Sequence, residues 1–436
     1  MSSPPSQTSP APIAIIGAGP CGLTLARLLE KSNPRIPYRV FERDVSATAN
    51  GTLSQGGTLD LHPHSGQAAL KAAGLEDEFE RLCRRNAASV FFQNSHGGDL
   101  VRFGAGEGSA PPEKGSAHDR PEIDRVQLRD MLLKSIPEEN VVWGKKLQSI
   151  ERSSDMKDKV TAGAKGWTLK FEDGSEETGF RLIVGADGAW SKVRPLISNA
   201  KPYYSGYTYI EGRINPTNPQ YAAVRAMVGA GNSAAMGNGR LLVIQQMSDE
   251  SYRLYAGVQE PEGFTKAGGL VDLSHGDTEK SRADLLKAYD GWAEHLLDYL
   301  KAAEGPWRYW PLNTLSADVF APEALGTEAW KRAPGVVLIG DAAHLAVPNG
   351  GGVNEAMLDA LKLSECISAE LKGGYDSGTD AESLERAIVA YETEMRPRAH
   401  EHVLDGIMMS EVMFSEDGAK KLNAMFNSTG AQESTA

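Results

Sequence analysis

The feature that most constrains the fold is a glycine-rich junction near the N-terminus. Four apolar residues, Ile13–Ile16, lead directly into three glycines spaced as G-x-G-x-x-G from Gly17 onward. Apolar residues with helical spacing follow over 23–31, and the next apolar segment ends at Glu42, 25 positions after Gly17. A buried parallel strand, a tight turn, a helix and a second strand with an acidic end make one βαβ unit. The N-terminal region therefore predicts a βαβ unit, the repeat from which Rossmann-like, doubly wound domains of the α/β class are built.

Each of the three glycines, Gly17, Gly19 and Gly22, has its own role in such a unit. The first allows the tight turn, the second lets the backbone approach a pyrophosphate, and the third lets the helix pack closely on the strand. Phosphates would bind at the helix N-terminus, and the Glu42 carboxylate would bind ribose hydroxyls. Because strand, helix and acid all have the required spacing, the pattern favours a dinucleotide site over a plain turn.

A second glycine-rich junction lies towards the C-terminus and reads GDAAHLAVPNGGGVNEAM over 340–357. An apolar strand over 335–341 ends at Asp341, and three consecutive glycines precede a helical segment that begins near Asn354. Such a junction presents free backbone N–H groups at a helix N-terminus beside one carboxylate. This combination suits a ligand that is partly anionic and partly hydroxylated.

A third segment, GADGAWSKVR over 185–194, follows another apolar strand and contains Asp187. Together the three segments resemble the FAD-dependent aromatic hydroxylase family, the group A flavoprotein monooxygenases. The resemblance implies FAD as the cofactor and NADPH as the reductant, with NADH as an alternative. It places the cofactor on residues of all three segments: Gly17, Gly19, Gly22, Glu42, Arg43, Asp187, Asp341, Gly350, Gly351, Gly352, Val353 and Asn354.

Within that family, the chain is most similar to the tetracycline-inactivating branch. The similarity rests on GGTLDLHPHSGQAALKAAGL (56–75), on RPEIDRVQLRDMLLKSI (120–136) and on the second glycine-rich junction. It extends over nearly the whole chain except the ends and loops. It implies two further contacts with FAD, from Asp60 and Arg129.

The positions that contact the drug in that branch differ here. A glutamine on a substrate-domain strand corresponds to Glu211, and a His-x-Gly corresponds to Tyr255-x-Gly257. The loop on the flavin side is shorter and reads Pro348-Asn349 before the glycines. The resemblance thus implies a substrate pocket formed by these five residues. The replacements argue against tetracycline and favour a flat, oxygenated aromatic or polycyclic natural product.

The resemblance also implies the domain organisation. A discontinuous FAD-binding domain would comprise 12–75, 120–200 and 326–380, and a sheet-based substrate-binding domain would comprise 76–119 and 201–325. Within the second domain, strand-like segments separated by turn signals predict a mostly antiparallel sheet, and they lie at 204–214, 221–228, 240–247 and 252–258.

The two ends of the chain are expected to differ from each other. The resemblance implies a long C-terminal helix over 381–425, and Pro397 predicts a kink in it because proline removes a backbone hydrogen bond. Segments 1–11 and 426–436 are polar, and we expect a disordered lead-in and a tail there.

The implied activity is insertion of one oxygen atom from O2 into an aromatic, enolic or polycyclic small molecule, through a flavin hydroperoxide. No side chain is expected to act as a catalytic acid or base, because the flavin supplies the chemistry. Baeyer–Villiger oxidation, epoxidation and flavin-dependent reduction stay open as alternatives. A halogenase is disfavoured, since WRYWP (307–311) lacks the usual W-x-W-x-I-P spacing. The intact glycine motifs disfavour a non-catalytic binding protein.

The composition limits the partners. A net charge of −13 disfavours nucleic acid, and no apolar stretch has the length of a membrane span. Three widely spaced cysteines form neither a disulfide framework nor a metal cluster, which favours the cytoplasm. We therefore expect a small-molecule substrate and O2 as partners, no metal, and a monomer or a dimer.

Overall fold

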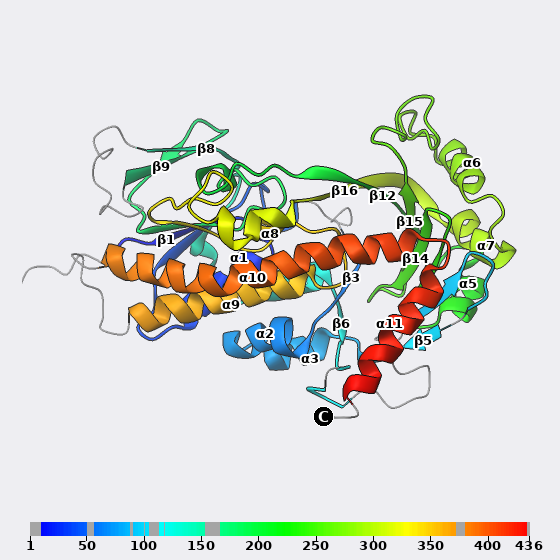
Figure 1. Cartoon of the computed structure of the whole chain (residues 1–436), viewed down its shortest axis with the longest axis horizontal. Coiled ribbons are helices and arrows are strands. Elements are labelled where there is room, and N and C mark those ends of the chain that lie inside the picture. The colour runs from blue at the N-terminus through cyan, green and yellow to red at the C-terminus, as the bar shows by residue number, and fades with distance from the viewer. Residues whose placement is uncertain are drawn as a thin grey trace, which may run out of the picture.

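The computed structural model describes residues 10–49, 56–87, 90–99, 101–103, 113–116, 118–152, 166–371 and 380–433. Two large sheets and the helices around them make up most of this part of the chain (Figure 1). The helices α9 (Gly352–Glu370) and α10 (Asp380–Phe414) pack against each other along the long axis, and α10 reaches from one sheet towards the other (Figure 1).

The first large sheet is parallel and has the strand order β17-β11-β1-β2-β7. In that order the strands are Val336–Leu338, Leu182–Gly185, Ile13–Ile16, Tyr38–Phe41 and Val141–Val142. All residues of β1 are buried, as a parallel strand covered on both faces requires. Helix α1 (Pro20–Lys31) joins β1 to β2 and packs against α9 and α4 (Arg125–Lys134). The predicted α/β class with a Rossmann-like, doubly wound sheet is confirmed.

Smaller elements surround the parallel sheet. A three-stranded antiparallel sheet consists of β8 (Leu147–Arg152), β9 (Trp167–Phe171) and β10 (Glu176–Glu177). A two-stranded antiparallel ribbon pairs β3 (Thr58–Asp60) with β6 (Glu122–Asp124). The short helices α2, α3 and α8 span Ala68–Ala73, Glu76–Leu82 and Asp341–His344.

The second large sheet has seven strands in the order β16-β12-β15-β14-β13-β4-β5. In that order the strands are Glu304–Thr314, Tyr203–Ile214, Tyr252–Gln259, Arg240–Gln246, Asn232–Gly237, Val90–Asn94 and Val101–Phe103. Every pair is antiparallel except β13 with β4. The helices α5 (Tyr221–Val228), α6 (Thr278–Ala288) and α7 (Glu294–Ala302) contribute to a hydrophobic core on one face of this sheet.

One predicted strand is wrong. Residues 221–228 form helix α5, and the sheet position is taken by β13, which was not predicted. The buried residues of α5 are Val224 and Val228, four positions apart, which is the spacing of one helix face. A short run of alternating apolar residues does not distinguish this pattern from a strand.

The C-terminal region also differs from the expectation of a single helix over 381–425. Helix α10 runs through Pro397 without interruption and ends at Phe414, and a separate helix, α11 (Gly418–Glu433), follows. The chain turns because the Ser415 N–H and hydroxyl both donate to the Val412 carbonyl oxygen, 3.1 and 2.8 Å away. Residues 426–433, expected as part of a tail, continue α11, whereas 1–9 and 434–436 lie outside the described residues. No described helix is long and apolar enough to span a membrane.

Candidate active site

The N-terminal glycine turn follows β1 closely. Gly17 has φ +109°, and a Cβ atom there would lie 2.4 Å from the carbonyl oxygen of Ala186. A Cβ atom on Gly22 would lie 2.2 Å from the carbonyl oxygen of Gly17. Gly19, by contrast, has no atom within 4 Å of its Cβ position. The packing of the turn therefore requires glycine at Gly17 and Gly22. The open space at Gly19 is where a pyrophosphate would approach the backbone.

Two charged residues that the sequence analysis assigned to the cofactor, Glu42 and Arg129, lie at this turn. The Glu42 carboxylate accepts hydrogen bonds from the N–H groups of Ala18 and Asp44, at 2.6 and 3.1 Å. The Arg129 side chain reaches across from α4 and donates to the carbonyl oxygen of Ala18 at 3.0 Å. Arg43 is exposed beyond the end of β2. The structure thus brings Glu42 and Arg129 to one turn, on opposite sides of Ala18.

The loop after β11 is shaped by Asp187. Its two carboxylate oxygens accept hydrogen bonds from the Ser191 hydroxyl and the Lys192 N–H, at 2.6 and 2.7 Å. Burial raises the pKa of Asp187 despite these hydrogen bonds. Both oxygens therefore stabilise the conformation of the loop. Asp187 thus contributes to the site by shaping this loop, and its carboxylate is not free to bind a ligand.

Arg194 is a site residue to which the sequence analysis gave no role. Its guanidinium group donates to the carbonyl oxygens of Ala189, Asp341 and Ala342, at 2.9, 2.8 and 2.8 Å. The residue is 3% exposed, and burial lowers the pKa of its guanidinium group. Arg194 thereby holds the loop after β11 against the segment after β17. Its place at the end of GADGAWSKVR was the available signal.

The second glycine-rich junction leaves one carboxylate open. Asp341 is exposed at the start of α8, and its side chain makes no hydrogen bond or ion pair with the described residues. The turn before α9 is closed by Asn349, whose side-chain oxygen accepts from the Gly351 N–H at 2.9 Å. Gly352 has no atom within 4 Å of its Cβ position. The N–H groups of this first turn, including that of Val353, are the ones that a helix leaves unpaired.

Asn354 has a different role from its neighbours in this turn. Its side-chain nitrogen donates to the Asp60 carbonyl oxygen at 2.8 Å, and its side-chain oxygen accepts from the His62 N–H at 2.7 Å. The Asn354 side chain therefore fixes the end of β3 to the start of α9. Asp60 itself forms a 2.9 Å contact with the His62 ring.

Below this turn, His344 and Asp359 form a buried ion pair with a 2.6 Å contact. Burial opposes both charges, but the pairing raises the pKa of His344 and lowers the pKa of Asp359 to about 2. Arg398 donates to the second oxygen of Asp359 at 2.9 Å. This cluster joins α8, α9 and α10, which agrees with a structural role for His344.

The predicted substrate residues lie on the seven-stranded sheet and on the loop before α9. Glu211 and Tyr255 are paired across β12 and β15, and Gly257 pairs with Tyr209. A Cβ atom on Gly57, at the start of the ribbon, would lie 2.9 Å from the Tyr255 hydroxyl oxygen. The ribbon thus brings the flavin-side segment against this sheet.

The Glu211 carboxylate is engaged by neighbouring side chains. It is buried, and its carboxylate oxygens are occupied by Arg253 and by the Trp310 ring N–H, the latter at 2.8 Å. Tyr255 instead offers an aromatic surface, with its ring centroid 5.9 Å from that of Tyr209. Burial raises the pKa of the Tyr255 hydroxyl, which therefore stays protonated at neutral pH.

The loop before α9 meets the sheet through Val347, which is buried in a small cluster with Tyr207 and Phe414. Pro348, the next residue, is exposed, and Asn349 is half-buried. Asn349 closes the turn before α9, and Val347, two residues earlier, contacts the sheet. One short loop therefore joins the first turn of α9 to the aromatic face of the sheet.

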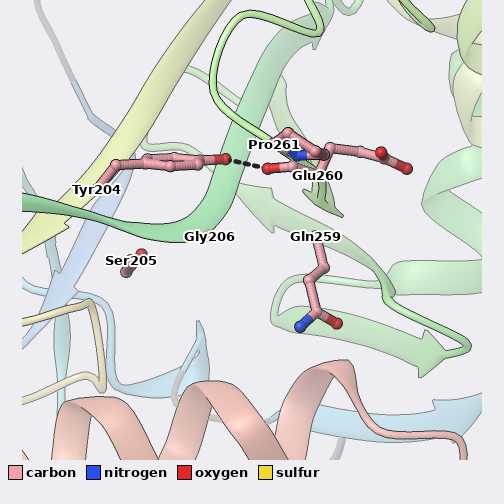
Figure 2. Close-up of a pocket in the computed structure, with 6 residues that line it drawn as sticks. All are labelled: Tyr204, Ser205, Gly206, Gln259, Glu260 and Pro261. Atoms are coloured by element: carbon pink, nitrogen blue, oxygen red, sulfur yellow. Dashed lines mark hydrogen bonds between the residues drawn. The ribbon is translucent and has the colours of Figure 1, made fainter.

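A surface hollow of about 430 Å³ lies where β12 begins and β15 ends (Figure 2). Figure 2 shows the Tyr204 hydroxyl directed at the Glu260 carbonyl oxygen, to which it donates at 2.8 Å. The lining residues are Tyr204, Ser205, Gly206, Gln259, Glu260 and Pro261. None of them belongs to the predicted substrate pocket, so we assign this hollow no role.

The doubly wound sheet, the open glycine turn and the second glycine-rich junction define the class: a flavoprotein with the architecture of FAD-dependent monooxygenases. The sequence profile of the FAD binding domain family matches residues 10–208 and 316–402, and the chain belongs to that family. The resemblance to the FAD-dependent aromatic hydroxylases is confirmed, and the chain is an FAD-dependent monooxygenase.

Two fungal relatives match over nearly the full chain. Monooxygenase asqM of Emericella nidulans is 30% identical over 432 residues, which cover 89% of this chain and 92% of the relative. Monooxygenase penA of Penicillium thymicola is 29% identical over 457 residues, which cover 97% of this chain and 100% of the relative.

Solved structures show the same fold. HpxO of Klebsiella pneumoniae, complexed with FAD and uric acid, has a TM-score of 0.69 at 22% identity, covering 95% of this chain and 91% of that one. PqsL of Pseudomonas aeruginosa in complex with 2-aminobenzoylacetate scores 0.65 at 19% identity, with 95% and 99% covered. Tetracycline destructase Tet(51) scores 0.61 at 16% identity, with 94% of each chain covered.

Proposed function

We propose that this FAD-dependent monooxygenase uses NAD(P)H and O2 to insert one oxygen atom into a flat aromatic, enolic or polycyclic natural product. The observation that carries the proposal is the convergence of three distant segments at one edge of the parallel sheet. The Arg194 guanidinium group joins two of them, and one of these two carries the open Asp341 carboxylate at the start of α8. We also propose the division into an FAD-binding and a substrate-binding domain given above.

The residues present fit FAD. The turn at Gly19 would admit the pyrophosphate, Glu42 would bind the ribose, and Asp341 would accept a hydrogen bond from a ribityl hydroxyl. The N–H groups at the start of α9 and the positive end of its dipole would favour negative charge on the pyrimidine ring. When bound, FAD would supply the redox chemistry, with two electrons from NAD(P)H, one O2 oxygen entering the substrate and the other leaving as water.

The protein would contribute binding, orientation and exclusion of water. The rings of Tyr209 and Tyr255, whose planes are inclined at 46° to each other, offer an aromatic surface for the substrate. Uric acid in HpxO and 2-aminobenzoylacetate in PqsL are oxygenated, conjugated small molecules, which supports this substrate class.

The experiment is to record the visible spectrum of the purified protein under anaerobic conditions, then after NADPH, and then after air. The proposal expects a yellow protein that bleaches and recovers while O2 is consumed, with a candidate substrate present if bleaching requires it. NADH is the matched comparison, and equal rates with both would remove the preference for NADPH. A protein that stays colourless when FAD is supplied would contradict the proposal.

The alternatives predict different products. Hydroxylation, epoxidation and Baeyer–Villiger oxidation all add one oxygen, so the position of the label from ¹⁸O2 in the product separates them. A flavin-dependent reductase would convert its substrate under anaerobic conditions, with no oxygen added.

A further inference from the structure

The ribbon of β3 and β6 contains a carboxyl pair, of which only Asp60 is expected to contact FAD. Glu122 on β6 lies directly opposite Asp60 on β3 in the antiparallel register. Side chains at such positions have Cβ atoms roughly 4.5–5.5 Å apart, and two like charges there repel each other. The ribbon therefore disfavours a state in which both carboxyl groups are ionised.

This ribbon also connects the two large sheets. On the flavin side, Asp60 is tied to the start of α9 by the 2.8 Å hydrogen bond from Asn354. On the substrate side, the side-chain nitrogen of Asn232 on β13 donates to Glu122 Oε1 at 2.8 Å. Glu122 and Asp60 therefore lie on the direct path from the first turn of α9 to the seven-stranded sheet.

The surroundings of Glu122 favour a proton on it. The residue is 7% exposed, and its Oε2 atom is buried with no hydrogen-bond partner among the described residues. Burial, followed by the charge of Asp60, raises the pKa of Glu122, and these effects outweigh the opposing effects of Thr58, Asn232 and Arg84. An ionised carboxylate with one unpaired buried oxygen is costly, whereas a protonated carboxyl group removes both the charge and the repulsion.

The other charged groups nearby form their hydrogen bonds and ion pairs with partners other than the Glu122 carboxyl group. Arg84 exchanges main-chain hydrogen bonds with Glu122, but its guanidinium group donates to Asp124 at 2.9 Å. The ring of His62 faces Asp60 at 2.9 Å. Among the described residues, no cation forms an ion pair with Glu122.

We propose that Glu122 is a positioning residue that holds a proton in the ribbon and so keeps the start of α9 and the seven-stranded sheet in their relative places. The inference rests on the proposed function only in taking α9 as the helix that faces the flavin. Ionisation of Glu122 would repel Asp60, loosen the ribbon and weaken the site at the start of α9.

The test begins with the infrared spectrum of the FAD-loaded protein. The wild type is expected to show the carbonyl band of a protonated carboxyl group, and this band should disappear as the pH rises. Glu122→Gln should lose one titrating component of this band in the difference spectrum against the wild type, whereas Glu139→Gln, at an exposed carboxylate, should keep the full band. If Glu122→Gln does not fold, Asp60→Asn serves instead, because removing the neighbouring charge should move the loss of the band to lower pH.

FAD affinity gives the second readout. The Kd of the wild type for FAD should rise about tenfold between pH 6 and pH 9, the factor that corresponds to one pKa unit. Glu122→Gln mimics the protonated state and should stay within about twofold over this range, since its side chain carries no charge. A wild type that never binds FAD would overturn the proposed function. A flavin-loaded wild type that lacks a titrating band, or a titrating band whose intensity is unchanged in Glu122→Gln, would overturn only the present inference.

Discussion

The two halves of the candidate site are built in different ways. At the edge of the parallel sheet, the site consists mainly of backbone: the turn at Gly17–Gly22 and the first turn of α9 after Gly351. On the seven-stranded sheet it consists of side chains, among them the rings of Tyr209 and Tyr255 and the buried pair of Glu211 and Arg253. A site built from backbone groups keeps the same ligand geometry when side chains change. The ligand specificity of a surface built from side chains changes with each substitution.

This difference predicts that the flavin side tolerates fewer substitutions than the sheet. On the flavin side, an added atom meets a carbonyl oxygen that belongs to the backbone and moves only with its strand. On the sheet, a change of side chain leaves the strands paired and alters only the surface that a substrate contacts. Substitutions on each side, together with a change of pH, test this contrast.

Gly17→Ala should destabilise the protein most. The new Cβ atom would lie 2.4 Å from the Ala186 carbonyl oxygen, at a residue with φ +109°. Backbone strain and overpacking together should lower the free energy of unfolding by about 4 kcal/mol. Thermal unfolding measures this loss. Gly19→Ala is the matched control, because its Cβ position is open; it should fold normally and weaken only FAD binding.

The pH dependence of the free energy of unfolding tests the packing beside the loop that precedes α9. His402 on α10 lies beside this loop, with its ring centroid 5.6 Å from that of His344. Burial, and then the charge of His344, lower the pKa of His402 to about 4. The neutral form of His402 therefore stabilises the folded state above pH 6.5. The free energy of unfolding should fall by about 3 kcal/mol as the pH falls from 6.5 through 4.

Chemical denaturation at several pH values checks this sign. His402→Leu should be less sensitive to acid than the wild type between pH 6.5 and 4, because it has no imidazole to protonate. An equally steep loss of stability in that variant would show that other groups cause the acid sensitivity.

Asp341→Ala should weaken FAD binding without unfolding the protein. The carboxylate is exposed and makes no contact with the described residues, so its loss leaves the fold intact. A ribityl hydroxyl would lose a charged acceptor, which corresponds to about 1.5–3 kcal/mol, or roughly a tenfold to 150-fold higher Kd for FAD. Fluorescence titration with FAD measures the change. Unaltered affinity would remove Asp341 from the site.

The same contrast explains what the sequence could predict. Gly17, Gly22 and Glu42 lie within one βαβ unit, so their arrangement follows from local spacing, and the family resemblance supplied Asp341. The α/β class followed from the same unit. The positions of these residues depend only on the neighbouring backbone or on a motif that the family shares, so they can be predicted from the sequence.

Hydrogen bonds between residues far apart in the sequence could not be predicted. Asn354 and His62 are hydrogen-bonded across 292 positions, and Arg194 reaches Asp341 across 147. Glu211 was placed on the right strand, yet Arg253 on the neighbouring strand occupies its carboxylate. Periodicity reports which face a residue lies on, but not which partner it meets there. Helix α5 was mistaken for a strand for a related reason, since its burial depends on the sheet beneath it.

Tyr255→Phe should have the smallest effect on the fold and a selective effect on the substrate. The ring contact with Tyr209 stays, so stability should change by no more than about 0.5 kcal/mol. Loss of the hydroxyl should raise KM about threefold, within the range of one neutral hydrogen bond, and leave the Kd for FAD unchanged. The measurement uses the first compound that gains one oxygen in a mass-based screen. A higher Kd for FAD would show instead that Tyr255 belongs to the flavin side, and the two halves of the site would then not be independent.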